Sequence, residues 1–148
     1  IHNTVNAKLF LIGYGSEKKK IIEYIKKNNL KKRITLISNN KNVYSYYKIA
    51  DLFVLSSIYE GFGNVLVEAG MFKIPIISTN CKSGPKEILK NGQCGDLVNI
   101  GDKKKMSKLI VKNLKKPDKS KISKMYQSLK IFNIKNHILQ YEKIFKKI

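Results

Sequence analysis

The sequence predicts an α/β fold in which a parallel sheet is covered by helices on both faces. Short apolar runs alternate with longer amphipathic stretches, and this order is typical of βαβ units with parallel strands. The apolar runs are continuous rather than alternating, as in strands that are buried on both sides. A chain of 148 residues has the length of one ordinary domain and is long enough to bury a core.

The individual elements follow from periodicity and from capping residues. Strands are predicted at 7–12, 33–37, 51–56, 74–78 and 96–98. Helices are predicted at about 16–29, 42–50, 64–72, 84–90, 102–114 and 133–147, with a break at 115–120. Ser16 is the expected N-cap of the first helix, and Pro85 stands near the first turn of the fourth. Open α/β sheets bind ligands at the carboxyl ends of their strands, which here lead into residues 13–15, 38–40, 57–64 and 79–84.

The sharpest local feature is the segment from Glu60 to Glu68, EGFGNVLVE, between a strand and a helix. Gly61 and Gly63 let the backbone approach a ligand without obstruction by a Cβ atom. A helix that begins near Asn64 presents backbone N–H groups and the positive end of its dipole, which favour a phosphate or diphosphate. The segment therefore indicates an anion site at the start of this helix.

Two carboxylates flank this anion site. Glu60 lies in the loop and Glu68 one turn into the helix, and each carboxylate suits a vicinal diol such as that of ribose or a hexose. This pattern is typical of a nucleotide-diphosphate-sugar site. Spacing alone leaves two plainer interpretations open, since Glu68 could serve the helix dipole and Glu60 could be a solvated loop residue.

The segment 60–68 resembles the E-x7-E signature of the retaining glycosyltransferases of family 4. The order of the remaining motifs is also similar to that family. These motifs are Gly13-x-Gly15, YKIADLFVLSS at 47–57, IPIIST at 74–79, GPKEI at 84–88 and NGQCG at 91–95. The resemblance covers about residues 7 to 98 and implies the C-terminal, Rossmann-like half of a GT-B fold.

The resemblance implies one nucleotide-sugar-binding domain over 1–148, in a fragment that lacks the N-terminal acceptor domain. A helix at 133–148 would cross back to that missing half. The Arg and Lys that the family normally places on the diphosphate would precede Ile1, so part of the cationic clamp is absent from this chain. We therefore expect the fragment alone to be inactive.

The resemblance also implies roles for individual residues. Glu68 would hold the ribose hydroxyls, and Glu60, the candidate catalytic residue, would contact the donor sugar. Ser38 and Asn39 would line the base, whereas Gly13 and Gly15 serve a tight turn at the donor site. The loop and helix start would meet the diphosphate and sugar through Gly61, Phe62, Gly63, Asn64 and Val65.

The implied reaction is transfer of a hexose or N-acetylhexosamine from a nucleotide diphosphate sugar to a glycan or lipid-linked acceptor, with retention. Residues 81–87, CKSGPKE, resemble bacterial enzymes that build surface or lipid-linked oligosaccharides, often with UDP-linked donors. Two other functions remain open, namely a basic α/β module that binds RNA or another polyanion, and a nucleotide-sugar epimerase of the same architecture.

Neither a metal nor a cofactor is expected besides the donor, because the sequence contains no D-x-D. The four aspartates, Asp51, Asp96, Asp102 and Asp118, are isolated. Cys81 and Cys94 form no CxxC motif and indicate a reduced, cytoplasmic protein.

The net charge of +20 indicates contact with the inner face of a membrane rather than with nucleic acid. Arg33 is the only arginine, whereas nucleic-acid readers usually depend on arginine for bidentate contacts. A compositional bias toward lysine, isoleucine and asparagine, as AT-rich coding produces, is the alternative explanation.

Overall fold

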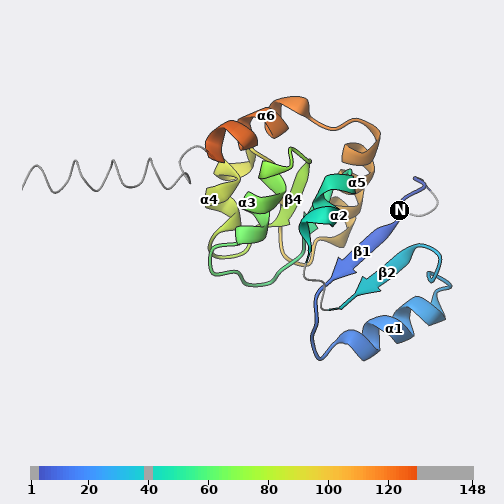
Figure 1. Ribbon diagram of the computed structural model, residues 1–148. Helices are drawn as coiled ribbons and strands as arrows, with labels where there is room; N and C mark the ends of the chain where they lie inside the picture. The colour runs from blue at the N-terminus through green and yellow to red at the C-terminus, as the bar shows by residue number, and fades with distance from the viewer. Residues whose placement is uncertain (1–3, 39–41, 130–148) are drawn as a thin grey trace, which may run out of the picture. The chain divides into compact units, whose positions relative to one another are not determined.

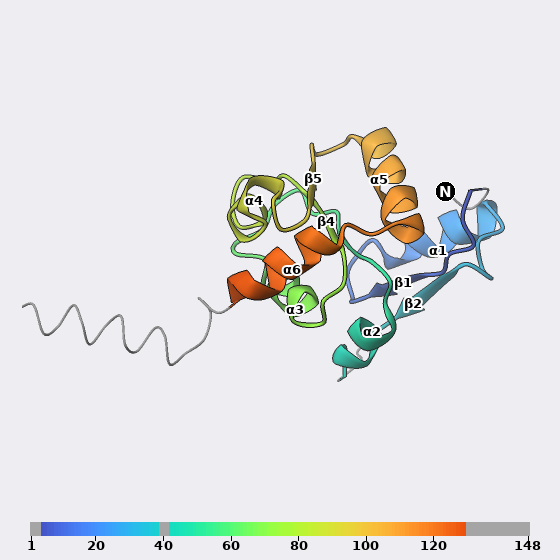
Figure 2. The same cartoon turned by 90° about the horizontal axis from the view of Figure 1, so that it is seen from above.

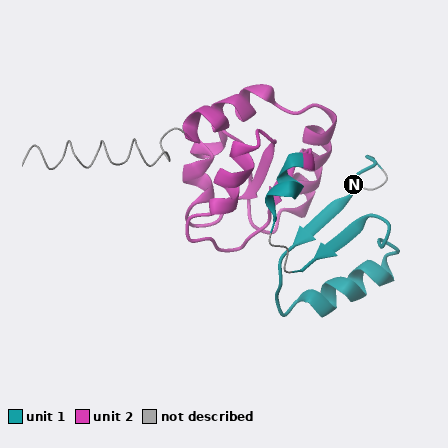
Figure 3. Cartoon of the chain, in the orientation of Figure 1, with its two compact units in different colours: residues 1–48 teal, residues 49–148 magenta. Residues whose placement is uncertain are grey.

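The computed structural model describes residues 4–38 and 42–129 and divides the chain into two compact units (Figures 1 and 3). Unit 1 comprises residues 1–48 and unit 2 comprises residues 49–148. Asn39 and the predicted helix at 133–147, with the crossover role of 133–148, fall outside the described residues. The single nucleotide-sugar-binding domain over 1–148 stays a prediction.

Unit 1 contains a parallel pair of strands and helix α1. Strand β1 (Leu9–Ile12) pairs with β2 (Ile34–Ile37), and Ile12 stands opposite Ile37 at their carboxyl ends. Helix α1 (Lys18–Lys27) connects them and buries Ile25. Helix α2 (Tyr44–Ile49) follows, and the boundary between the units falls near its end.

Unit 2 contains a three-stranded parallel sheet with the order β3-β4-β5. The strands are β3 (Phe53–Leu55), β4 (Ile76–Thr79) and β5 (Asp96–Val98). The helices are α3 (Asn64–Met71), α4 (Pro85–Ile88), the 3-10 helix η1 (Lys90–Gly92), α5 (Lys103–Lys115) and α6 (Lys119–Ser128).

Strand β4 lies at the centre of unit 2. All four of its residues are buried, and successive residues of a strand point to opposite faces, so both faces of β4 are covered. Helices α3 and α5 both lie against this strand (Figure 2). The parallel α/β prediction is therefore confirmed, with strand bounds within about two residues of those expected.

One prediction about a helix end is wrong. Helix α1 begins at Lys18 after Glu17, and no side chain caps it, so Ser16 is not the N-cap. Glu17 instead pairs with Lys20 at 3.0 Å, an ion pair within the first turn that places a carboxylate at the positive end of the helix dipole.

Helix α6 was not expected, because lysines and serines hide its apolar positions. Asp118 caps it by accepting hydrogen bonds from the backbone N–H groups of Ser120 and Lys121, at 3.0 and 3.2 Å. Met125 is 1% exposed and lies directly on Gly70 of α3. A Cβ atom at Gly70 would come within 2.7 Å of Met125, so this glycine allows α3 and α6 to approach closely.

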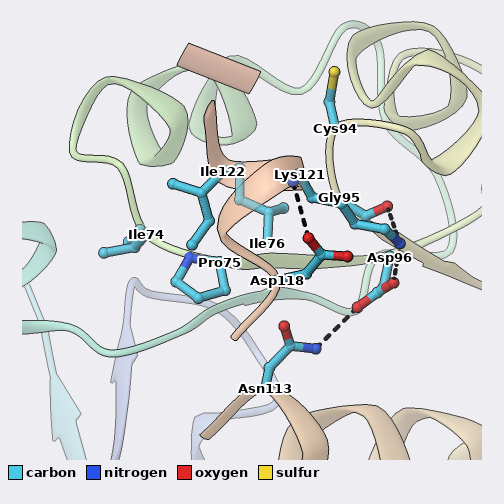
Figure 4. Close-up of a pocket in the computed structure, with 10 residues that line it drawn as sticks. All are labelled: Ile74, Pro75, Ile76, Cys94, Gly95, Asp96, Asn113, Asp118, Lys121 and Ile122. Carbon is cyan, nitrogen blue, oxygen red and sulfur yellow. Dashed lines mark hydrogen bonds and ion pairs between the residues drawn. The ribbon is translucent and has the colours of Figure 1, made fainter. Parts of the chain in front are cut away.

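A polar cluster joins β5, α5 and α6 at the amino end of the sheet (Figure 4). Asp96 forms an ion pair with Lys121 and accepts a hydrogen bond from Asn113 Nδ2 at 2.9 Å. Burial by itself would raise the pKa of Asp96. The hydrogen bonds from Lys121 and Asn113 and the charges of Lys121 and Lys112 outweigh that effect, so the pKa lies below its usual value. The carboxylate is therefore stabilised in its charged form in the folded protein.

Replacement of Asp96 by Asn should lower the free energy of unfolding by about 1–2 kcal/mol at neutral pH, because Lys121 loses its charged acceptor. Because the pKa of Asp96 is lower in the folded state, its carboxylate stabilises the fold at pH values above the unfolded-state pKa of about 3.9. This stabilisation is lost as the pH falls through the folded-state pKa. Asp96→Asn should remove this part of the acid dependence, measured by urea unfolding at several pH values. The exposed Asp51→Asn is the control, and an equal change in both variants would contradict the assignment.

None of the helices that the structure describes is long and apolar enough to cross a membrane. The longest of them, α5, has 13 residues. At 1.5 Å per residue such a helix extends about 20 Å, whereas a bilayer core is about 30 Å thick.

Candidate functional site

The loops after β3 and β4 meet at the carboxyl edge of the sheet in unit 2, where serine and threonine hydroxyls hold Glu60. Ser57 Oγ donates to Glu60 Oε1 at 2.7 Å, and Ser83 Oγ donates to the Glu60 backbone oxygen at 2.6 Å. Thr79 Oγ1, at the end of β4, donates to the Ser57 backbone oxygen at 2.6 Å. The loop position and the carboxylate orientation of Glu60 are thus both fixed by neighbouring hydroxyls.

Gly84 brings the second loop against the first. Its φ is +83°, and a Cβ atom placed on it would lie 2.0 Å from the backbone oxygen of Phe62. No side chain fits in that space, and the neighbouring atoms belong to the backbone and not to a flexible side chain. Only glycine therefore permits this contact between the loops.

Gly63 marks the change from loop to helix. Its φ of +89° is left-handed, and its carbonyl oxygen accepts from the N–H of Leu66 at 2.9 Å, which forms the first turn of α3. Helix α3 begins at Asn64, as the sequence predicted, so its N-terminal turn lies directly after the Glu60 loop. The first N–H groups of a helix have no partner within the helix, and they favour an anion.

The remaining predicted residues of unit 2 lie along this loop and helix. Glu68 is half-buried in α3, one turn beyond its start, and Val65 lies in the first turn. Gly61 is exposed, and a Cβ atom on it would meet nothing within 4 Å. The need for a glycine at position 61 thus stays a prediction about a bound ligand. The segment from Glu60 to Glu68 forms one continuous junction of loop and helix.

The other predicted residues lie in unit 1. The N–H of Gly13 donates to the Ile37 oxygen at 3.0 Å, and the φ of Gly13 is +144°, so a glycine is required where β1 ends. Ser38 follows β2 and accepts from Lys18 Nζ at 3.0 Å. Gly15 has open space around it. Asn39 lies outside the described residues.

Four polar residues that contact the predicted site residues or their loops were not identified from the sequence, namely Ser57, Thr79, Ser83 and Lys18. Ser57 and Ser83 lie in loops at the carboxyl ends of strands, and Thr79 is the last residue of β4. This location is the signal that could have indicated them. Single serines and threonines are too common in loops to single out without knowledge of the partner that each one meets. Lys18 lies within a run of three lysines, and only the fold shows that it reaches Ser38.

The crevice in Figure 4 is not part of this site. Ile76 and Asp96, which line it, are the first residues of β4 and β5, so the crevice lies at the amino edge of the sheet. Across 4–38 and 42–129, no group of three or more His, Cys, Asp or Glu side chains is placed to hold a metal ion.

The chain matches the family described as glycosyl transferases group 1 over residues 2–130. It is 44% identical over 98 residues to an uncharacterized glycosyltransferase of Methanocaldococcus jannaschii, which covers 66% of this chain and 23% of that protein. It is 31% identical over 99 residues to a Campylobacter jejuni protein, which covers 67% of this chain and 27% of the relative. That relative is named N-acetylgalactosamine-N,N'-diacetylbacillosaminyl-diphospho-undecaprenol 4-alpha-N-acetylgalactosaminyltransferase.

Solved structures show the same fold. The Anabaena protein HepE in complex with UDP superimposes with a TM-score of 0.81 at 20% identity, over 96% of this chain and 41% of HepE. The chain spans about a quarter of the length of the two relatives above. The chain belongs to the glycosyl transferases group 1 family and has the α/β fold of the C-terminal, Rossmann-like half of a GT-B glycosyltransferase.

Proposed function

We propose that the chain is the donor-binding part of a retaining family 4 glycosyltransferase. It binds a nucleotide diphosphate sugar, with UDP as the favoured nucleotide, whose hexose or N-acetylhexosamine passes to a glycan or lipid-linked acceptor. The observation that carries this proposal is the fixed Glu60, held by Ser57 and Ser83 next to the N-terminal turn of α3. HepE, which shares the fold, binds UDP, and the Campylobacter relative acts on a diphospho-undecaprenol compound.

Three parts of the donor, namely the diphosphate, the ribose and the transferred sugar, are assigned to different parts of this site. The diphosphate lies at the start of α3, where the backbone N–H groups and the helix dipole offset its charge. Glu68 accepts from the ribose hydroxyls, and Glu60 accepts from the hydroxyls of the transferred sugar. Ser57 donates to Oε1 of the Glu60 carboxylate, and the two lone-pair regions of Oε2 suit a diol.

The chemical contribution of this half is electrostatic. The bond between the anomeric carbon and the diphosphate oxygen breaks, the sugar takes on oxocarbenium character, and negative charge grows on the leaving diphosphate. N–H groups aimed at the leaving group stabilise that charge more strongly in the transition state than in the ground state. The acceptor oxygen then bonds to the anomeric carbon on the face that the diphosphate left, and the proton of the acceptor hydroxyl passes to the departing diphosphate oxygen. The acceptor and the remaining cations come from the N-terminal half.

Calorimetric titration of this chain with UDP, GDP and ADP, and with their sugar conjugates, tests the proposal. We expect UDP and a UDP-sugar to bind, with the sugar conjugate tighter, and Glu60→Ala to remove that difference. Binding of none of the nucleotides, or tighter binding of a random RNA, would favour the polyanion-binding module. An epimerase would instead change the donor sugar without an acceptor, which a product assay on the protein joined to its N-terminal half distinguishes.

Transfer by the protein joined to its N-terminal half should proceed without a divalent metal or any other cofactor. The reason is that the sequence has no D-x-D, while the α3 N-terminus provides positive potential at the diphosphate. Transfer activity measured in EDTA should stay within about twofold of the activity measured in Mg²⁺ or Mn²⁺. A tenfold loss would correspond to about 1.4 kcal/mol of transition-state stabilisation by the metal. Loss of transfer in EDTA that either metal restores would disprove metal independence.

The proposal includes a cytoplasmic location with peripheral contact at the inner face of the membrane. A lipid-linked acceptor keeps its reactive end at the membrane surface, so a protein that binds there stays near its substrate. The net charge of +20 favours association with anionic lipids.

A further inference from the structure

Helix α5 has an exposed face formed almost wholly of lysine. The helix contains six lysines and no acidic residue. At about 100° per residue, five of its exposed lysines fall within an arc of about 100° on one side of the helix. We call this surface the lysine face, and it consists of Lys104, Lys105, Lys108, Lys112 and Lys115.

This arrangement is unfavourable for the isolated protein. Lys104 and Lys108, like Lys108 and Lys112, are four residues apart, and like charges at that spacing repel each other on a helix. Asp102 caps α5, but the three residues that follow it are all lysines, at the end of the helix dipole that favours acids. An external anionic surface would offset both costs.

A general bias toward lysine does not account for this pattern. Helix α1 is also rich in lysine, but it contains Glu23, and Glu17 just before it pairs with Lys20. Four of its five lysines also fall within an arc of about 120° at 100° per residue, but Glu23 lies in the middle of that arc. Of these two helices, only α5 has a lysine-lined side with no acidic residue of the same helix within it.

The chemistry of the lysine face fits lipid headgroups better than RNA. It contains no arginine for bidentate contacts and no aromatic ring on which a base could stack. Ile100, just before α5, is 47% exposed, and an exposed apolar side chain beside lysines is typical of helices that lie at a membrane interface. Lysines near an anionic leaflet need no fixed geometry.

The position of the helix agrees with this role. Strand β5 runs parallel to β4 and ends at Val98, so the start of α5 lies at the same carboxyl edge of unit 2 as the Glu60 loop. We propose that the lysine face of α5 docks the protein on an anionic lipid surface, with Ile100 entering the headgroup region. This inference rests on the proposed function, which includes contact with a membrane, and it assigns that contact to one face of α5.

Vesicle sedimentation with the 148-residue chain tests the docking surface. The test variant is Lys104→Gln/Lys108→Gln/Lys115→Gln, and the matched control is Lys19→Gln/Lys26→Gln/Lys27→Gln on α1, which loses the same charge from exposed positions. The vesicles are phosphatidylcholine alone, or with about 30 mol % phosphatidylglycerol to supply the anionic surface. Glutamine is a good helix former, and circular dichroism confirms that each variant is folded.

The unchanged chain should bind the anionic vesicles and not the neutral ones, and added salt should release it. The α5 variant should lose about tenfold or more in partition coefficient, and the α1 control at most about threefold. Equal losses in the two variants, absence of binding to anionic vesicles, or tighter binding to a random RNA would overturn the proposal. UDP calorimetry on the same samples is independent of lipid, so failure of docking is distinguishable from failure of donor binding.

Discussion

Gly84→Ala should unfold at a markedly lower urea concentration than the unchanged chain, with a loss of about 2–4 kcal/mol. Two costs add up at this position. A side chain at a φ of +83° is strained, and its Cβ atom would stand 2.0 Å from the backbone oxygen of Phe62. The polypeptide can relieve that clash only by moving one of the two loops apart from the other.

The same change should weaken UDP binding by about tenfold or more, since the displaced loop carries Glu60 and leads into α3. Gly101→Ala is the matched control, because Gly101 also has a φ of +83° but has open space around it. That variant should lose only the conformational part, about 1–2 kcal/mol, and keep its UDP affinity. Similar losses in the two variants would mean that the contact with Phe62 is unimportant.

Glu68→Ala should raise the dissociation constant for UDP by roughly 5- to 150-fold, which corresponds to about 1–3 kcal/mol of lost charged hydrogen bonds. The free nucleotide and the sugar conjugate should be affected alike, because Glu68 is assigned to the ribose and not to the sugar. Calorimetry with UDP and with a UDP-sugar measures both effects.

Glu87→Ala, an exposed carboxylate on α4, is the control for loss of one negative charge. Its UDP affinity should stay within about twofold, since charges that are exposed to solvent interact weakly. Thermal unfolding of Glu68→Ala shows whether the helix itself is intact. If UDP binds a folded Glu68→Ala variant with unchanged affinity, the ribose assignment is wrong.

The elements that the sequence predicted well are those whose signals are local. Strand β5 has the expected bounds, and α3 starts at Asn64 after a glycine, because the apolar run and the Gly63 turn are encoded by adjacent residues. The same holds for α5, which Asp102 caps by accepting from the Lys105 N–H at 2.9 Å. These signals need no knowledge of distant parts of the chain.

The features that the sequence did not predict depend on contacts between distant residues. Helix α6 has a weak apolar pattern of its own, and Met125 becomes a core residue only because Gly70 of α3 provides the space. In the site, Ser83 reaches Glu60 across 23 positions of the chain. The motif identified the two glutamates, but the hydroxyls that orient one of them could be found only from the fold.

The Asp96 cluster has an evolutionary consequence. It joins β5, α5 and α6 at the amino edge of the sheet, while the Glu60 loop and Gly84 lie at the carboxyl edge of the same strands. The Asp96 ion pair and the residues proposed to bind the donor are thus separated by the length of a strand. If these loops bind the donor as proposed, substitutions in them would change donor preference without weakening that ion pair, and one scaffold could diversify among many sugars.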